Sequence, residues 1–274
     1  MKSGPGLLGL ELLGVPVRLA SGDADLSERL TLCYARVRQV PVHDGALHAS
    51  AERCGSQWRI HVEGREERYE ADAIGAVRAL NHELLHGIML RARELYYVHA
   101  AAVAWRGRGI VLPGRSRAGK STLALALVLE GARLLSDEVL AFDPACGKAL
   151  AFPRAIKIRD ECAAYFPELA PGFQGTGEGR FLGFDALSPD VVAGEARVDA
   201  VVVSRWAGGA STRVARISRG EALLALAESS LNFGTHGRRS LDCLSELVGE
   251  AETFSLRWQE PREAARALLR ELAA

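Results

Sequence analysis

The chain has 274 residues, which is enough for one large domain or two smaller ones with a sizeable apolar core. Its 34 lysines and arginines equal its 34 aspartates and glutamates, so the formal net charge is zero. This balance argues against a dedicated nucleic-acid or anionic-membrane surface, because either normally requires a basic excess. The sequence also lacks an apolar run of membrane-spanning length and the apolar core of a signal peptide. We therefore expect a cytoplasmic protein with neither a nucleic-acid nor a membrane partner.

The cysteines carry little chemical signal. There are five of them, they lie far apart, and they form no C-x-x-C pair: Cys33, Cys54, Cys146, Cys162 and Cys243. An odd and scattered set is typical of reduced thiols in a cytosolic protein rather than of a disulfide framework.

Residues 1–95 form the first predicted region, a small β-rich part with a connecting helix. Alternating apolar residues and turn residues predict four strands, at 15–19, 47–52, 57–63 and 67–70. Helical spacing predicts two helices: one over 26–37, begun by Asp23 or Asp25, and one over 71–94 that leads into the rest of the chain.

The second of these helices contains His82-Glu83-Leu84-Leu85-His86, which matches H-E-x-x-H. Two histidines four residues apart could share a Zn²⁺ ion, with Glu83 as the base of a hydrolase. However, Met89 stands where the extended motif has glycine, and no third histidine follows at the required spacing. We favour an amphipathic structural helix and keep a zinc hydrolase as the remote alternative.

Residues 96–274 form the second predicted region, which begins with a strand over 97–105. A turn then leads into the next strand. If this turn closes a tight hairpin, Val103 faces Leu112, and His99 arrives opposite Ser116. Sequence spacing thus predicts an imidazole beside the loop that follows, although a half-buried strand histidine is the plainer interpretation.

That loop matches G-x-x-x-x-G-K-[ST], the phosphate-binding P-loop, over Gly114, Arg115, Ser116, Arg117, Ala118, Gly119, Lys120, Ser121 and Thr122. Glycines let backbone N–H groups turn toward an anionic phosphate chain, and the lysine reaches the β/γ oxygens. The serine hydroxyl joins a Mg²⁺ shell, and the following helix offers its positive end. An apolar strand at 109–113 and a helix at 122–130, stopped by Gly131, frame the loop. The pattern predicts binding of a nucleoside triphosphate such as ATP, with Mg²⁺.

Another apolar strand is predicted over 132–143, and the adjacent carboxylates Asp137 and Glu138 interrupt it. In a β–loop–α–β unit, a carboxylate on the second strand can lie next to the bound phosphates. One acid could then hold Mg²⁺, and the other could accept a proton from an attacking hydroxyl. The alternative is a solvated pair of acids at a strand end.

The remaining elements are read from periodicity and from glycine and proline. Two prolines and five glycines predict an irregular, mobile loop over 161–183. A strand is expected at 198–204, and helices are expected at 221–231, at 240–248 and from Pro261 to the end.

The histidine strand, the loop with Ser116 and the closely following Ser136-Asp137-Glu138 together resemble the kinase domain of HPr kinase/phosphorylase and its relatives. Those relatives share a core with phosphoenolpyruvate carboxykinases. A Pro-Arg segment at 151–159 and a helix ending in Asn-Phe at 218–233 are also similar to the family. The resemblance covers residues 97–250. It implies an α/β fold. The P-loop kinase core would resemble the sheet that HPr kinase shares with phosphoenolpyruvate carboxykinases, and the small β-rich region would precede it in the chain.

The resemblance also implies an activity, the ATP-dependent phosphorylation of a hydroxyl, in the first place serine, on a protein or peptide. It assigns the general base to Asp137, assisted by His99, and the binding of the transferring phosphoryl group to Lys120. Ser121 and Glu138 would then lie in or near the shell of a Mg²⁺ ion.

Basic residues outside the loop are the candidates for binding substrate. The resemblance directs Arg154 and Lys157 of the Pro-Arg segment toward the site. Arg238 and Arg239 lie in a glycine-flanked turn that could clamp a phosphate or an acidic acceptor, or could simply begin a solvated helix. The family loop commonly has glycine where this chain has Arg117, which changes either the loop geometry or its charge.

The region before His99 does not resemble the usual N-terminal domain of HPr kinase. The pattern is closer to standalone relatives, including kinases that modify the precursors of lasso peptides. A peptide-tailoring kinase of that kind and a non-catalytic nucleotide-binding regulator are the two alternatives to a protein kinase. The oligomeric state is open, with a homo-oligomer among the alternatives.

Overall fold

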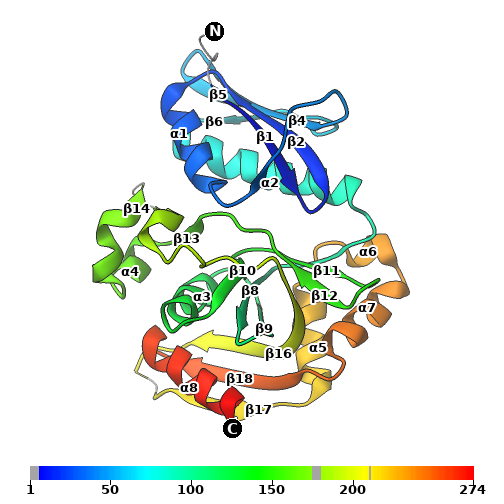
Figure 1. Cartoon of the computed structure of the whole chain (residues 1–274), viewed down its shortest axis with the longest axis vertical. Helices are drawn as coiled ribbons and strands as arrows, with labels where there is room; N and C mark the ends of the chain where they lie inside the picture. Colours follow the sequence, from blue (N-terminus) through cyan, green and yellow to red (C-terminus); the bar gives the residue numbers. More distant parts are fainter. Residues whose placement is uncertain (1–5, 175–179, 210) are drawn as a thin grey trace. The chain divides into compact units, whose positions relative to one another are not determined.

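The computed structural model describes residues 6–174, 180–209 and 211–274, and it has a mixed α/β architecture (Figure 1). The chain divides into two compact units, Met1–Arg93 and Glu94–Ala274. The sequence predicts this boundary two residues later, between residues 95 and 96. In the part of the chain that is described, no helix combines the length and the apolar character needed to cross a bilayer.

The first unit is one six-stranded sheet with two helices. Its sheet order is β3-β1-β2-β4-β5-β6, in which only β2 and β4 pair in parallel. The elements, in chain order, are β1 (Leu7–Leu12), β2 (Val15–Ser21), α1 (Ala24–Cys33), β3 (Arg38–Gln39), β4 (Leu47–Cys54), β5 (Gln57–Val62), β6 (Arg68–Glu70) and α2 (Ala73–Arg91).

Helix α2 packs tightly on this sheet through Gly87. A Cβ atom added there would lie 3.0 Å from a methyl group of Leu47 and 3.2 Å from one of Val62. At the start of α1, Asp23 is the capping residue, and its carboxylate accepts a hydrogen bond of 3.0 Å from the Leu26 amide. Helix α1 ends at Cys33, four residues before the predicted end.

The second unit is built on a nine-stranded sheet. Its main path is β10-β8-β9-β16-β12-β11-β7, and β18 pairs with β16 and β17. The strands are β7 (Tyr96–Val98), β8 (Ala100–Trp105), β9 (Arg108–Pro113), β10 (Arg133–Ser136), β11 (Leu140–Asp143), β12 (Lys148–Leu150), β16 (Glu195–Trp206), β17 (Arg213–Arg216) and β18 (Glu252–Trp258). The helices are α3 (Lys120–Leu129), α5 (Arg219–Glu228), α6 (Phe233–His236), α7 (Arg239–Val248) and α8 (Pro261–Ala273).

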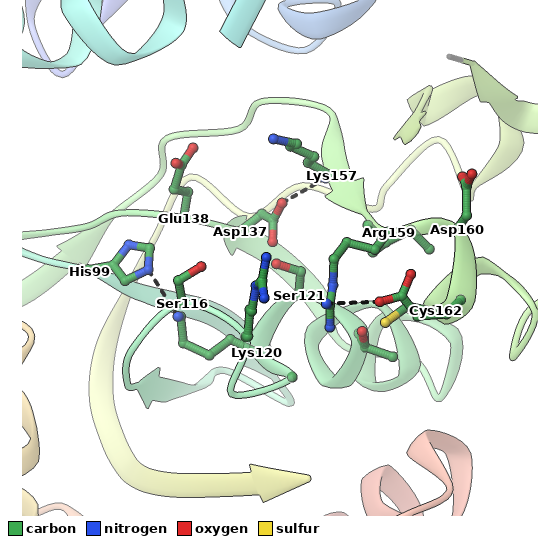
Figure 2. A pocket seen from close by; sticks show the side chains of 15 residues that line it. His99, Ser116, Lys120, Ser121, Asp137, Glu138, Lys157, Arg159, Asp160 and Cys162 are labelled. Carbon is green, nitrogen blue, oxygen red and sulfur yellow. Dashed lines mark hydrogen bonds and ion pairs between the residues drawn. The ribbon is translucent and has the colours of Figure 1, made fainter. Parts of the chain in front are cut away.

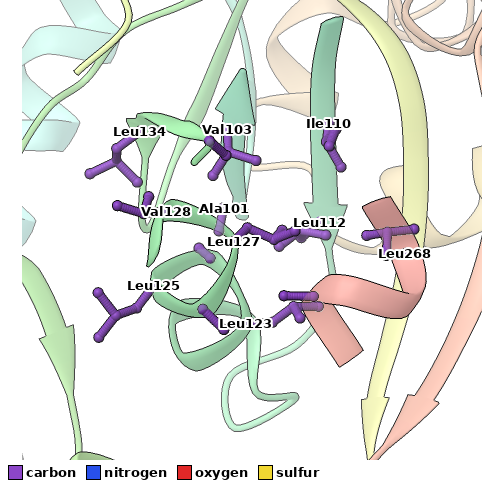
Figure 3. Close-up of a cluster of buried hydrophobic side chains, with 14 of the residues drawn as sticks. Ala101, Val103, Ile110, Leu112, Leu123, Leu125, Leu127, Val128, Leu134 and Leu268 are labelled. Carbon is purple, nitrogen blue, oxygen red and sulfur yellow. The ribbon is translucent and has the colours of Figure 1, made fainter. Parts of the chain in front are cut away.

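Both faces of this sheet are covered, and consecutive strand residues therefore enter different cores. Val103 and Leu112 pack with Leu123 of α3 and Leu268 of α8 on one face (Figure 3). Their neighbours, such as Val111, pack on the other face with residues of α5 and α7. A sheet buried on both faces explains the unbroken apolar runs that the sequence shows here.

The β8–β9 hairpin differs from the predicted register by two residues. Val103 lies opposite Ile110, and the turn consists of only Arg106 and Gly107. Both turn residues have positive φ, 51° and 81°, as a two-residue hairpin turn of the favoured handedness requires. The prediction allowed a longer turn, because Gly109 also reads as a turn residue, and it was wrong on this point.

The strand predicted over 97–105 is in fact two strands that meet at His99. Strand β7 pairs with β11, where Val98 lies opposite Leu140, and β8 pairs with β10, where Ala102 lies opposite Ser136. The two position numbers sum to 238 in both pairs, so one antiparallel register continues across the break. The interruption at His99 therefore faces the interruption at Asp137–Val139, although the two lie far apart in sequence.

A third, small sheet begins within the Pro-Arg segment at 151–159. It contains β13 (Ile156–Ile158), β14 (Phe173–Gln174) and β15 (Arg180–Leu182) in the order β13-β15-β14. Helix α4 (Asp160–Ala163) and two 3₁₀ helices, η1 (Pro167–Gly172) and η2 (Phe184–Ala186), complete this part. The sequence predicted an irregular loop over 161–183. The structure instead has short regular elements there, and the prediction also falls on residues 175–179, which lie outside the described residues.

Candidate functional site: a cavity at the phosphate loop

The loop between β9 and α3 requires its second glycine for two independent reasons. Gly119 has φ of 86°, which only glycine adopts without strain, and a Cβ atom there would lie 2.6 Å from the Trp258 ring. That ring is buried and fixed, because its Nε1 donates a hydrogen bond of 2.7 Å to the Ser204 hydroxyl. Strands β16 and β18 thus support the start of α3 from below the loop.

The lysine of the loop is buried and curls back over it. Lys120 Nζ donates hydrogen bonds of 2.7 Å and 3.0 Å to the carbonyl oxygens of Gly114 and Arg115. It also lies 3.1 Å from Nε2 of His99 (Figure 2). Burial lowers the pKa of Lys120 to about 8, so the ammonium form still predominates at neutral pH.

His99 reaches the lysine because the strand is broken at this residue. Its backbone N–H donates a hydrogen bond of 2.7 Å to the carbonyl of Ser229 at the end of α5. Burial lowers the pKa of the imidazole, and the positive charge of Lys120 lowers it further. A neutral ring is the form that can accept a hydrogen bond from the lysine ammonium.

Asp137 lies in the opposite break and is the most unusual ionisable group of the site. Its Oδ2 accepts a hydrogen bond of 2.8 Å from the Lys157 amide, whereas its buried Oδ1 has no hydrogen-bond partner within the described chain. Burial raises the pKa of this carboxyl, and the nearby Ser121 hydroxyl and the hydrogen bond from Lys157 oppose that effect. A buried acceptor without a partner is rare, and it marks a place where a ligand or a proton donor can bind.

The neighbouring carboxylate has the opposite electrostatics. Glu138 forms an ion pair with the buried guanidinium of Arg154, which lowers the pKa of Glu138, and about half of its side chain is exposed (53%). Adjacent acids whose pKa values are displaced in opposite directions are suited to different tasks. Asp137 is suited to exchange a proton, and Glu138 is suited to remain charged.

These groups line one cavity of about 660 Å³ (Figure 2). The loop and α3 form one wall, β13 and α4 form the facing wall, and the two strand breaks lie between them. The lining residues are His99, Ser116, Arg117, Gly119, Lys120, Ser121, Thr122, Asp137, Glu138, Lys157, Ile158, Arg159, Asp160, Glu161 and Cys162.

The structure therefore brings together most of the residues that the sequence singled out, and it distributes the basic candidates differently. Lys157 lines the cavity, and Arg154 reaches the site through its ion pair with Glu138. Arg238 and Arg239 are at the start of α7, and neither is among the described residues that line the cavity.

Sequence reasoning missed the α4 wall and one positioning residue. The wall carries charged side chains, of which Arg159 and Glu161 form an ion pair of 2.8 Å. The buried Asn232 accepts a hydrogen bond from the Tyr97 amide and donates one to the Leu95 carbonyl, both of 2.9 Å. These two bonds hold β7 just before His99, and the only sequence signal for them was the Asn-Phe at the end of the predicted helix.

The oxygen donors beside the phosphate loop fit a magnesium ion. Mg²⁺ prefers oxygen ligands and typically takes only one or two from protein carboxylates, the others coming from phosphates and water. The Ser121 hydroxyl and the half-exposed carboxylate of Glu138 are ligands of this kind, and the unpartnered Oδ1 of Asp137 stays available beside them. Across the described ranges, no cluster of three or more histidine, cysteine, aspartate or glutamate side chains is arranged to hold a metal ion.

Comparisons with known proteins do not identify the function of this site. No protein-family model matches the chain, and a search of curated proteins finds no match. Among solved structures, the chain is similar to the HPr(Ser) kinase/phosphatase from Coxiella burnetii, with 15% sequence identity and a TM-score of 0.34. The similarity covers 65% of this chain and 95% of that one.

Proposed function

We propose that the second unit is an ATP-dependent kinase that transfers the γ-phosphoryl group to a hydroxyl, in the first place a serine, of a protein or peptide. The observation that carries the proposal is the buried, unpartnered Oδ1 of Asp137, which lies in the same cavity as Lys120 of the phosphate loop. A phosphate cradle alone would serve any nucleotide-binding protein. A carboxylate with a raised pKa beside it supplies what proton abstraction requires.

The loop would bind the triphosphate. Backbone N–H groups of Gly114–Lys120 and the positive end of α3 would surround the β- and γ-phosphates. Lys120 would exchange its hydrogen bonds to two loop carbonyls for bonds to phosphate oxygens. His99, with its neutral ring, keeps the ammonium on the cavity side of the loop.

Asp137 would act on the acceptor. As its carboxylate takes the hydroxyl proton, the acceptor oxygen forms a bond to the γ-phosphorus. The bond from that phosphorus to the β–γ bridging oxygen breaks, and ADP leaves with the electron pair. A magnesium ion held by Ser121, Glu138 and the nucleotide would supply charge neutralisation when bound. Glu138, which its ion pair with Arg154 keeps charged, would preserve the negative field around that cation.

The experiment is a transfer assay on the full chain with γ-labelled ATP, Mg²⁺ and a library of serine-containing peptides and proteins. Mass spectrometry then locates the modified residue. We expect a phosphoserine product, and we expect Lys120→Ala to abolish its formation. ATP binding without transfer to any acceptor would instead favour a nucleotide-binding regulator. Hydrolytic activity that survives Lys120→Ala and requires zinc would favour the hydrolase alternative.

A further inference from the structure

Arg117 has a backbone conformation that its position does not explain. Among the residues that the structure describes, only Leu13, Arg106 and Arg117 are non-glycine residues with positive φ, at 52°, 51° and 70°. Leu13 and Arg106 each begin a two-residue hairpin turn and are followed by a glycine that also has positive φ. Arg117 is followed by Ala118 in the phosphate loop, at a place where glycine would adopt the same backbone conformation without strain.

The side chain of Arg117 is also left available. It is exposed and lines the cavity together with Lys120 and Asp137. Its loop neighbour Arg115 approaches Glu228 at 3.8 Å, whereas the guanidinium of Arg117 forms no ion pair or hydrogen bond with the described part of the chain. A cation in a phosphate-binding loop that the protein itself does not neutralise is suited to neutralise a ligand.

We propose that Arg117 is a catalytic arginine that the phosphate loop itself supplies, with the terminal phosphate of a bound nucleoside triphosphate as its partner. This inference rests on the proposed kinase function. Guanidinium has a planar fork of donors that matches phosphate oxygens, and it stays charged at any working pH. An arginine at position 117 thus accepts backbone strain and in return places a permanent positive charge in the cavity.

The proposal predicts effects of opposite sign on stability and on activity. Arg117→Gly removes both the strain and the guanidinium, so the Tm without nucleotide should rise while kcat falls by roughly 10-fold or more. Arg117→Ala keeps the Cβ atom and removes only the charge, so kcat should fall with no gain in Tm. Arg106→Gly is the matched control. It relieves a similar strain in the β8–β9 turn and removes the contact of the Arg106 guanidinium with the Trp105 ring at 4.5 Å, and it should leave kcat unchanged.

Equilibrium binding separates this inference from the proposed function. Calorimetry with ATP and with ADP measures how strongly each variant prefers the terminal phosphate. We expect the wild-type chain to prefer ATP and Arg117→Gly to lose most of that preference, whether or not an acceptor is found. If Arg117→Gly keeps both the ATP/ADP affinity ratio and kcat within twofold, the proposal is wrong. An absence of transfer by the wild-type chain, with the affinity ratio still sensitive to Arg117, would overturn only the kinase assignment.

Discussion

Two short sequence segments, the H-E-x-x-H match at 82–86 and Ser136-Asp137-Glu138, each contain a buried acid, and the surroundings of the two acids are opposite in kind. In α2 of the first unit, Glu83 forms ion pairs through both oxygens, at 2.8 Å with Arg65 and 2.6 Å with Arg68. In the second unit, Asp137 makes a hydrogen bond through one oxygen only, and its Oδ1 has no partner among the described residues.

The pKa directions follow from these partners. Burial by itself raises the pKa of each acid. At Glu83, hydrogen bonds from Arg65 and His82 and the charges of the two arginines outweigh burial and lower the pKa. At Asp137 the nearby Ser121 hydroxyl and the Lys157 amide do not outweigh it, and the pKa remains raised. A buried acid whose two oxygens both have partners stabilises a fold, whereas a buried acid with an unpartnered oxygen is available for chemistry.

The largest expected effect comes from replacing the ionisable carboxyl group of Asp137. Asp137→Asn should lower kcat for transfer by about 10²–10⁴-fold, the usual contribution of a general base. ATP affinity should change little, because the loop and Lys120 are intact. Stability at pH 7 should not fall, because an amide is less costly to bury than a carboxylate. Steady-state kinetics and denaturant unfolding test these three expectations, and near-normal transfer by this variant would remove the assigned base.

The corresponding acid-to-amide substitution at Glu83 should have the reverse effect, a loss of stability with activity retained. Glu83→Gln removes the charge that pairs with Arg65 and Arg68, which should lower the free energy of unfolding by about 1–3 kcal/mol. The two arginines are partly exposed and can be rehydrated, which limits the loss. Transfer activity at 25 °C should be retained. Guanidinium unfolding of the two variants side by side measures the contrast, and a loss of turnover without a loss of stability would contradict it.

The pH dependence of the free enzyme should sharpen the comparison further. Lys120 is charged below its pKa of about 8 and neutral above it, so kcat/KM should fall by about 10-fold per pH unit on the alkaline side. On the acid side, kcat/KM should fall as Asp137 is protonated, at a pH above the ordinary range of an aspartate because its pKa is raised. Lys120→Arg is the control. Its alkaline limb should move beyond the measurable range, and an unchanged limb would assign that pKa to another group.

The smallest expected effect concerns the histidines of α2. Their ring centroids lie 4.6 Å apart, and His82 Nδ1 is 3.2 Å from the carboxylate of Glu83, which is already paired with two arginines. The double variant His82→Ala/His86→Ala should keep transfer activity within about twofold. Metal analysis of the purified wild-type chain should find no stoichiometric zinc. Stoichiometric zinc that disappears in the double variant would restore the hydrolase alternative.

The sequence alone determined the local features of this protein. The strand, the loop and the helix around Lys120 occur where the pattern predicts them, because glycine conformation, helix starts and apolar periodicity act within a few residues. Most strands of the first unit followed from alternation for the same reason. The α8 helix followed from the proline at its first turn.

Only the tertiary structure decided which distant residues meet. The break at His99 faces the break at Asp137 because one β-ladder register spans both, and no local pattern encodes a register between strands so far apart. Long-range packing likewise places the fixed Trp258 ring against Gly119 and brings Arg65 and Arg68 to Glu83. Local preferences select elements, whereas the partners of a buried charge are set by long-range packing, and those partners distinguish a structural acid from a reactive one.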